Sequence, residues 1–296
     1  MSDTAVVEVF APDSGLPPVP PSVPGRRLRM VARYTLLTLA ALIVLFPIYS
    51  AVVVSIQPAF ALIDFPGVLF PTEFDFSTFG DAIEVGDLGR GLLNSTIAAS
   101  IITVFQVTTS VLAAYAFAFL RFPGKRVIFY AFLATLMVPT EVIVVAQFEL
   151  ISDLGWLESF QGLCVPFLAF AFGTFMIRQA FLGVPSDLRD ATALDGYGHG
   201  GFLWHVAVPL ARPAIAGLAV FSFLFAWNQY LWPRLVATDP DVRTVQIGLR
   251  QLASTNVDEL NLVIAGTLVA ALPIAVVLIV FQRHLVRGLT AGAVKG

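Results

Sequence analysis

The stretch Val184-Pro185-Ser186-Asp187-Leu188-Arg189-Asp190-Ala191-Thr192-Ala193-Leu194-Asp195-Gly196 is a short polar segment with long apolar segments on both sides. Pro185 and Ser186 form a helix start signal, and Asp187 suits the positive first turn of a helix. Gly196 supplies the backbone freedom that ends a helix. Asp195 lies at the negative helix end, where a carboxylate is mildly unfavourable. The pattern predicts a small polar helix in which Asp195 either completes the turn with Gly196 or serves an outside partner.

The composition is that of a membrane protein. Hydrophobic residues make up 57% of the 296 residues, and charged residues make up only 12%. A soluble domain carries about a quarter charged residues. The single cysteine, Cys164, excludes a disulfide framework within the chain. The three histidines, His199, His205 and His284, have no second set of ligands around them, which disfavours a metal site.

Apolar segments long enough to cross a bilayer, which takes about 20 helical residues, recur along the chain. They cover residues 34–56, 92–120, 127–150, 162–181, 213–232 and 262–281. Pro139 is expected to kink the third segment. Residues 1–25, rich in proline and small residues, are expected to be a disordered cytoplasmic leader, and residues 26–296 a single membrane domain. The sequence therefore predicts an all-α membrane protein with six transmembrane helices.

Positive charge gathers on one side of this arrangement. The N-terminal region, the turn at 121–126, the region 178–212 and the C-terminal tail hold thirteen of the seventeen lysines and arginines. The loops of the opposite side hold only Arg90, Arg234, Arg243 and Arg250. Because positive residues favour the cytoplasmic side, both termini and the polar stretch are predicted to be cytoplasmic.

The polar stretch resembles the coupling loop of ABC-importer permeases. In that family Glu-Ala-Ala is followed by three residues, a glycine, nine residues and Ile-x-Leu-Pro. Here the pattern reads Asp190-Ala191-Thr192, three residues, Gly196, nine residues and Val206-Ala207-Val208-Pro209. The spacing is the same at every step. The departures are Asp for Glu, Thr for the second Ala, and Val for both Ile and Leu.

The resemblance implies a type I ABC importer permease fold in a bacterial inner membrane. It implies a coupling loop over residues 184–212 that docks in a cleft of a soluble ATPase, through Leu188, Asp190, Ala191, Leu194, Asp195 and Gly196. The implied partners are a second homologous permease, two ATP-binding subunits and an extracytoplasmic binding protein. A plain cytosolic turn is the alternative interpretation of the stretch.

The chain itself is not expected to be an enzyme or to hold a cofactor. It contains no G-x-x-x-x-G-K-[ST] phosphate loop, so ATP and Mg²⁺ are expected to bind the partner subunits. Residues 196–201 spell G-x-G-x-x-G, but the dinucleotide-binding fingerprint needs a strand before it and an acid about twenty residues later. Here a helical pattern precedes it and residues 214–221 are apolar, so the match is rejected.

The end of the fifth span resembles sn-glycerol-3-phosphate permeases within the maltose-type carbohydrate-uptake family. It reads Trp227-Asn228-Gln229-Tyr230-Leu231-Trp232-Pro233, and residues 136–142 and 178–181 point the same way. The tail at 288–296 resembles that of maltose-type permeases. The implied cargo is sn-glycerol-3-phosphate or a glycerophosphodiester, and a di- or oligosaccharide is the alternative.

A substrate pathway is predicted from six residues in two segments. Aromatic rings can stack on the C–H faces of a polyol while amides bond its hydroxyls, although such residues also form the aromatic belt at a membrane interface. An acid within a span is costly and usually functional, although structural pairing is the alternative. The predicted pathway residues are Glu141, Trp227, Asn228, Gln229, Tyr230 and Trp232.

A phosphorylated cargo needs cations or helix N-termini, yet no lysine or arginine lies in the middle of a span. The partner permease, the binding protein or the outer-loop arginines could supply the cations.

Two other classes of protein fit less well. An ion-coupled secondary transporter would bury acids in several spans and show an internal repeat, whereas only Glu141 qualifies. A membrane-embedded enzyme would gather its catalytic groups at one membrane face, whereas the candidates here are scattered.

Overall fold

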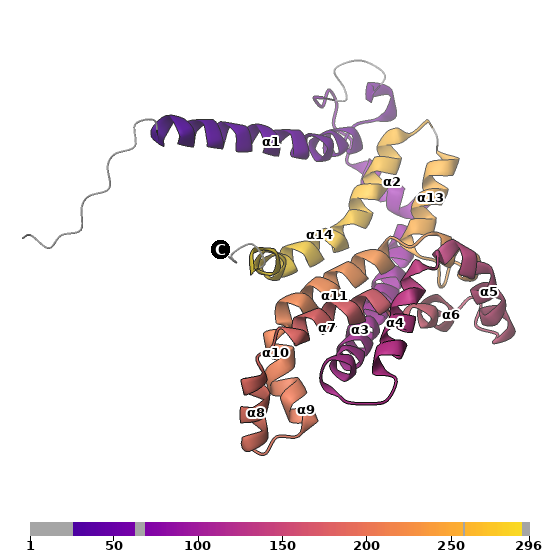
Figure 1. Cartoon of the computed structure of the whole chain (residues 1–296). Helices are drawn as coiled ribbons and strands as arrows, with labels where there is room; N and C mark the ends of the chain where they lie inside the picture. Colours follow the sequence, from indigo (N-terminus) through magenta and orange to yellow (C-terminus); the bar gives the residue numbers. More distant parts are fainter. Residues whose placement is uncertain (1–25, 63–68, 257, 292–296) are drawn as a thin grey trace, which may run out of the picture. The chain divides into compact units, whose positions relative to one another are not determined.

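The computed structural model describes residues 26–62, 69–256 and 258–291, and every regular element among them is a helix (Figure 1). The predicted leader, residues 1–25, and the last five residues of the tail lie outside the described residues. The elements are α1 (Arg26–Ser55), η1 (Ala59–Leu62), α2 (Ser77–Val85), α3 (Leu88–Phe119), α4 (Lys125–Ala134), η2 (Thr135–Met137), α5 (Thr140–Asp153), α6 (Phe160–Cys164), η3 (Val165–Phe167), α7 (Ala171–Leu182), α8 (Ser186–Leu194), α9 (His199–Phe202), η4 (Leu203–Ala207), α10 (Val208–Leu210), α11 (Arg212–Trp227), α12 (Leu231–Val236), α13 (Val245–Thr255) and α14 (Leu260–Ala291).

Three unbroken helices within the described residues are long and apolar enough to cross a membrane: Leu28–Ser55, Leu88–Phe119 and Leu260–Arg283. Three further candidates are bent pairs, namely Lys125–Met137 with Glu141–Asp153, Phe160–Phe167 with Ala171–Leu182, and His199–Leu210 with Arg212–Trp227. If each bent pair is one span, the total is six. Five of them lie over the predicted apolar segments, whereas the pair at 199–227 begins well before the predicted segment 213–232 and includes residues that were predicted to belong to the cytoplasmic loop.

Proline residues account for two of the three bends. The pair around Pro139 bends by 101°. Val138 there has φ −84° and ψ 116°, because the ring of a following proline excludes the helical conformation. The pair before α11 bends by 77° at Ala211, and Pro213 occupies the first turn of α11, where its missing N–H leaves no bond unmade. The expected kink at Pro139 is confirmed, and the helix there is broken rather than merely curved.

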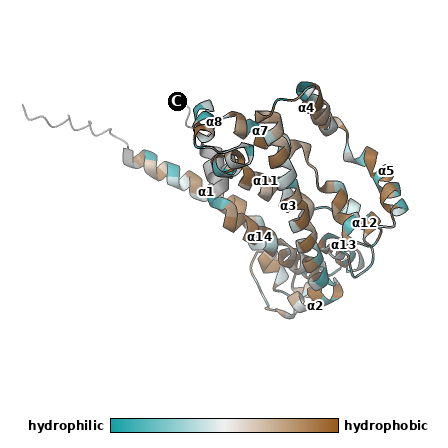
Figure 2. Ribbon diagram, turned by 90° about the horizontal axis from the view of Figure 1, so that it is seen from below, coloured by the Kyte–Doolittle hydropathy of each residue, from teal (hydrophilic) through white to brown (hydrophobic). Residues whose placement is uncertain are grey.

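Helix α3 is the centre of the bundle. It packs along α7 and α11, while α14 packs on α11, α2 and α13 (Figure 1). Apolar residues dominate α3, α11 and α14, whereas α8 carries many polar residues (Figure 2). Hydrophobicity surrounds α3 almost evenly, as expected of a helix that spans a membrane and packs on several neighbours.

Polar side chains of α3 hold the carbonyl groups that the helix breaks leave free. Between η3 and α7, the carbonyl of Phe167 accepts a bond from Gln106 Nε2 at 2.8 Å, and that of Leu168 accepts from Thr109 Oγ1 at 2.9 Å. At the other end of α3, Asn94 Nδ2 donates to the carbonyls of Asp241 and Arg243 at 3.1 and 3.0 Å. A carbonyl without a partner in an apolar medium costs several kcal/mol, about 4–8 in the extreme, so these bonds permit the breaks.

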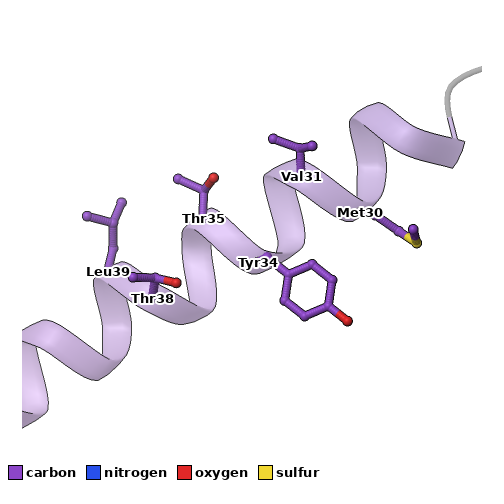
Figure 3. A pocket seen from close by; sticks show the side chains of 6 residues that line it. All are labelled: Met30, Val31, Tyr34, Thr35, Thr38 and Leu39. Carbon is purple, nitrogen blue, oxygen red and sulfur yellow. The ribbon is translucent and has the colours of Figure 1, made fainter.

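The chain divides between Ile48 and Tyr49 into two units, so that most of α1 belongs to the first. Within that unit, six residues on adjacent turns of α1 line a shallow pocket (Figure 3). Their spacing of three and four places them on one helical stripe of mixed polarity. They are Met30, Val31, Tyr34, Thr35, Thr38 and Leu39.

Gly173 lies where α7 packs closely against its neighbours in the second unit. A Cβ atom there would lie 2.5 Å from Ser110 Oγ of α3 and 3.0 Å from Leu218 Cδ1 of α11. Three helices therefore converge on a site that admits no side chain, as small-residue contacts between membrane helices do. Gly217 on α11 has open space where its Cβ would lie.

We expect Gly173→Ala to destabilise the bundle by about 1–3 kcal/mol, because overpacking forces side chains out of position. Gly217→Ala is the matched control and is expected to be neutral or slightly stabilising, since alanine favours helix by roughly 1 kcal/mol. Thermal unfolding of the purified protein in detergent compares the two. Equal melting temperatures for both variants would contradict the close packing at Gly173.

Candidate coupling loop and transport cavity

Helix α8 ends in a backbone arrangement that its sequence dictates. Gly196 has φ +80°, in the left-handed region that glycine adopts without strain. The N–H of Tyr197 bonds the carbonyl of Thr192 at 3.1 Å, and the N–H of Gly196 bonds that of Ala193 at 3.1 Å. This pair of bonds is the Schellman motif, which closes a helix at glycine. At the other end Ser186 makes no capping bond, and Pro185 fixes the start instead.

The predicted docking residues of α8 are exposed. Leu188 is 40% exposed and Leu194 is 89% exposed, and Asp190, Ala191 and Asp195 also lie at the surface. Thr192 is the buried residue of the helix, and its hydroxyl donates to the carbonyl of Leu188. Asp190 lies 3.6 Å from Arg189 Nε in an exposed ion pair. Exposed leucines next to exposed carboxylates have the chemistry of a docking surface, and the docking itself stays a prediction.

The loop is held to the bundle through Tyr115 of α3. Its hydroxyl donates to the carbonyl of His199 at 3.0 Å and lies 2.9 Å from the Nδ1 atom of the same residue. The Tyr115 ring also contacts Phe181 of α7 and Phe202 of α9, and all three side chains are buried. Helix α9 is thereby fixed to both α3 and α7, while α8 projects beyond them (Figure 1).

Tyr115 is a functional candidate that the sequence analysis missed. The one sequence feature that could have marked Tyr115 is its position, a polar phenol in the last two turns of an apolar span close to the predicted cytoplasmic side. A buried tyrosine hydroxyl needs a hydrogen-bond partner, and the partner lies 84 residues later in the chain. Sequence spacing alone does not reveal such a pair.

A second feature is a cavity of about 200 Å³ among α5, η3, α11 and α12. Its lining combines carboxylate, amide and aromatic groups: Glu141, Val144, Gln147, Phe167, Phe225, Gln229, Tyr230, Leu231 and Trp232. Trp232 is 5% exposed, and its Nε1 donates to the carbonyl of Gly162 at 3.1 Å. The Phe167 ring lies 5.9 Å from that of Trp232. The cavity wall is therefore locked by packing and by a buried hydrogen bond.

Four of the six predicted pathway residues meet at this cavity, namely Glu141, Gln229, Tyr230 and Trp232. The other two do not. Trp227 is 1% exposed and stacks on Phe223 in a separate cluster of α3, α11, α13 and α14. Asn228 Nδ2 donates to the carbonyl of Leu224 at 2.7 Å, which ends its own helix. Neither position lines the cavity, because Trp227 packs on the opposite cluster and Asn228 bonds back to its own helix.

The described residues contain no group of three or more histidine, cysteine or acidic side chains that could hold a metal ion. Cys164 is a buried free thiol.

Comparison with known proteins identifies the family. Residues 106–291 match the family described as "Binding-protein-dependent transport system inner membrane component". The chain belongs to this family. It is an inner-membrane permease component of an ABC transporter, and such permeases are the non-catalytic subunits.

Relatives of the chain match it over nearly all of its length. The sn-glycerol-3-phosphate transport system permease protein UgpE of Yersinia pestis bv. Antiqua (strain Antiqua) is 34% identical over 90% of this chain and 98% of its own. The protein of the same name from Shigella flexneri serotype 5b (strain 8401) is 36% identical over 86% of this chain and 94% of its own. A chain of a bacterial ABC transporter involved in the import of the acidic polysaccharide alginate superposes with a TM-score of 0.74 at 25% identity, covering 90% of this chain and all of that one.

In this permease, Gly196→Ala is expected to strain the end of α8 by roughly 1–2 kcal/mol, because a Cβ disfavours the left-handed conformation. No atom lies within 4 Å of the added methyl group, so the effect is conformational and not steric. Asparagine tolerates this conformation better than alanine, so Gly196→Asn is expected to retain more function. We measure cargo uptake by the assembled transporter and expect it to decrease from glycine through asparagine to alanine at position 196. Equal uptake for all three would contradict this expectation.

Tyr115→Phe removes the bonds to His199 and keeps the ring. We expect the cargo transported per ATP hydrolysed to fall about two- to tenfold, since each net hydrogen bond contributes about 0.5–1.5 kcal/mol. Tyr130→Phe is the matched control, because Tyr130 is exposed on α4 and its hydroxyl has no hydrogen bond to the described residues. The measurement is made in proteoliposomes that hold the whole transporter. An unchanged ratio in Tyr115→Phe would show that this contact does not couple the loop to the bundle.

Proposed function

We propose that the chain is the permease subunit of an ATP-driven importer of sn-glycerol-3-phosphate or glycerophosphodiesters. The observation that carries the proposal is the 34–36% identity to permeases named for sn-glycerol-3-phosphate transport, over almost their whole length. The assembly would contain a second homologous permease, two ATP-binding subunits and an extracytoplasmic binding protein. Both termini and α8 would lie in the cytoplasm, as the distribution of lysine and arginine predicts.

The energy would come from the partner subunits. This chain has no phosphate-binding loop, so ATP hydrolysis belongs to the subunits that α8 would contact. Leu188, Ala191 and Leu194 would enter a cleft of the ATPase, with Asp190 and Asp195 beside basic groups. Closure of the ATPases would then move α8, and through α9 and Tyr115 it would move α3 and α7 as a rigid unit. The result is alternating access, in which the pathway opens to one side at a time.

The two readings of the cargo differ in what the cavity has to hold. A glycerol backbone is a three-carbon polyol, whereas an oligosaccharide presents several rings. The relatives named above favour the first reading, and uptake with both kinds of cargo distinguishes them. An ion-coupled transporter would instead respond to a proton or sodium gradient.

The test is uptake of radiolabelled sn-glycerol-3-phosphate by proteoliposomes that contain all subunits and the binding protein. We expect uptake to require ATP on the side of the ATPase subunits and to persist when proton and sodium gradients are collapsed. Asp195→Lys is expected to abolish uptake without changing cargo binding by the binding protein. Asp153→Lys, on an exposed residue at the end of α5, is the matched control and is expected to transport normally.

Each part of the proposal has its own contradicting outcome. Uptake without ATP would exclude the ABC mechanism. Uptake of a di- or oligosaccharide in place of sn-glycerol-3-phosphate would leave the mechanism intact and overturn the cargo. Normal transport by Asp195→Lys would remove α8 from the coupling role.

A further inference from the structure

The cavity has the size of a small polar fragment. Its volume of about 200 Å³ lies below the range of roughly 300–1,000 Å³ that is typical of pockets for drug-sized ligands. Its polar groups come from two separate segments, Glu141 and Gln147 on α5 and Gln229 and Tyr230 between α11 and α12. The rings of Phe167, Phe225 and Trp232 complete the wall. Polar groups that converge between apolar rings suit a ligand with several hydroxyls on a short carbon chain.

The side-chain amide of Gln229 has a hydrogen-bond donor without a partner in the described part of the chain. The Nε2 atom of Gln229 is buried and has no hydrogen-bond partner among the described residues. A buried donor without a partner costs about 1–3 kcal/mol, so its retention calls for a reason. The terminal torsion of a glutamine is broad, so the amide of this cavity-lining residue can turn toward the cavity. A ligand oxygen there would satisfy the donor.

Charge decides the orientation of a phosphorylated ligand. Glu141 lines the cavity, and no lysine or arginine is among the lining residues. A phosphate beside the Glu141 carboxylate would be repelled, whereas glycerol hydroxyls can donate hydrogen bonds to it. The phosphate end must therefore lie away from Glu141.

A positive group is present beside another part of the wall. Arg234 of α12 donates from Nη1 to the Tyr230 hydroxyl at 3.0 Å, and its guanidinium lies 5.7 Å from the centre of the Tyr230 ring. Arg234 is exposed, and no ion pair within the described residues neutralises it. Guanidinium groups bind phosphate oxygens through charge-assisted hydrogen bonds, so this contact gives the cavity a cationic edge.

We propose that this cavity is a cargo subsite, in which Glu141 and Gln229 bind the glycerol hydroxyls while Arg234, held by Tyr230, contacts the phosphate. This assignment rests on the proposed function and adds to it the residues of this subunit that touch the cargo and the direction in which the cargo lies. It also supplies, from an outer-loop arginine, a cation that the apolar spans lack.

The first experiment measures selectivity between two cargoes of different charge. At neutral pH a phosphate monoester carries about −1.5 to −2 charges. The phosphate of a diester has one ionisable oxygen fewer, and in glycerophosphocholine its single negative charge is balanced by the choline cation. Uptake at limiting concentration is compared for sn-glycerol-3-phosphate and glycerophosphocholine, with the complete transporter and the same binding protein throughout. The preference of the binding protein then cancels between permease variants.

We expect Arg234→Gln to lower the ratio of monoester to diester uptake by about threefold or more, since one extra charge near an exposed cation is worth at least this factor. Arg234→Lys should retain an intermediate ratio because it keeps the charge. Arg250→Gln, an exposed arginine on α13, is the matched control and should leave the ratio unchanged. A purely structural role for Arg234 would lower uptake of both cargoes equally and would overturn the phosphate contact.

The second experiment tests the buried donor. Gln229→Leu should reduce uptake of both cargoes about two- to tenfold if the cargo accepts the hydrogen bond. If the donor merely stays unsatisfied, leucine should be neutral or stabilising, because an apolar group of similar shape removes the cost. Gln161→Leu, an exposed glutamine on α6, is the control. Copurification with the ATPase subunits confirms that each variant assembles.

The outcomes of these experiments distinguish failure of the subsite proposal from failure of the proposed function. Transport of sn-glycerol-3-phosphate by the wild type, together with unchanged ratio in Arg234→Gln and unchanged uptake in Gln229→Leu, would overturn the subsite and leave the proposed function standing. Failure of the wild type to transport either cargo would overturn the proposed function, and the subsite with it.

Discussion

The structure depends on the hydrogen bonds that satisfy backbone groups where its apolar helices break. A straight span satisfies its own backbone, but a bend of 45° between α6–η3 and α7 leaves carbonyl groups without partners. Gln106 and Thr109 of α3 supply the missing donors at Phe167 and Leu168. These bonds fix η3 against α3, and η3 contributes Phe167 to the cavity. The breaks are thus both the weak points of the spans and the places where the cavity can form.

The same helix links the cavity to the coupling loop. Its middle binds the break before α7, and its last turns bind α9 through Tyr115. Close packing at Gly173 joins α3, α7 and α11 between these two levels. Packed helices move as rigid bodies, because interdigitated side chains resist continuous deformation. A push on α8 would therefore be carried along α3 to the region of the cavity without any need for local unfolding.

In the proposed subsite, a membrane domain with few cations would meet the phosphate of its cargo at the edge of the cavity. A cation in the middle of an apolar span is costly, so the positive group lies at its edge, on an exposed turn of α12. Tyr230 joins the two environments, since it lines the cavity and accepts a bond from Arg234. The carboxylate of Glu141 would then disfavour the reversed orientation of such a cargo. Recognition of this kind uses opposite charges at two ends of one site.

Local sequence signals determined a large part of the fold. The lengths of the apolar segments predicted the positions of five of the six candidate spans and the second half of the remaining one, because a bilayer sets a minimum helix length. Pro139 predicted a kink, since proline removes a backbone donor and restricts its neighbour. Gly196 predicted the end of α8 and its left-handed turn. The spacing around Asp190 and Gly196 predicted the family, which the comparisons confirm.

Long-range contacts decided the rest. The sequence grouped Trp227 and Asn228 with Gln229, Tyr230 and Trp232. In the structure the last three line the cavity, whereas Trp227 packs in another cluster and Asn228 bonds its own helix. It gave no sign that Tyr115 meets His199, or that Arg234 is held at the cavity by Tyr230. Hydropathy and residue spacing describe how a single segment meets its surroundings, so the sequence by itself determined the spans, the end of α8 and the family. Which side chains meet across segments depends on the packing of α3, α7 and α11, and only the tertiary structure decided it, because those contacts join residues far apart in the chain.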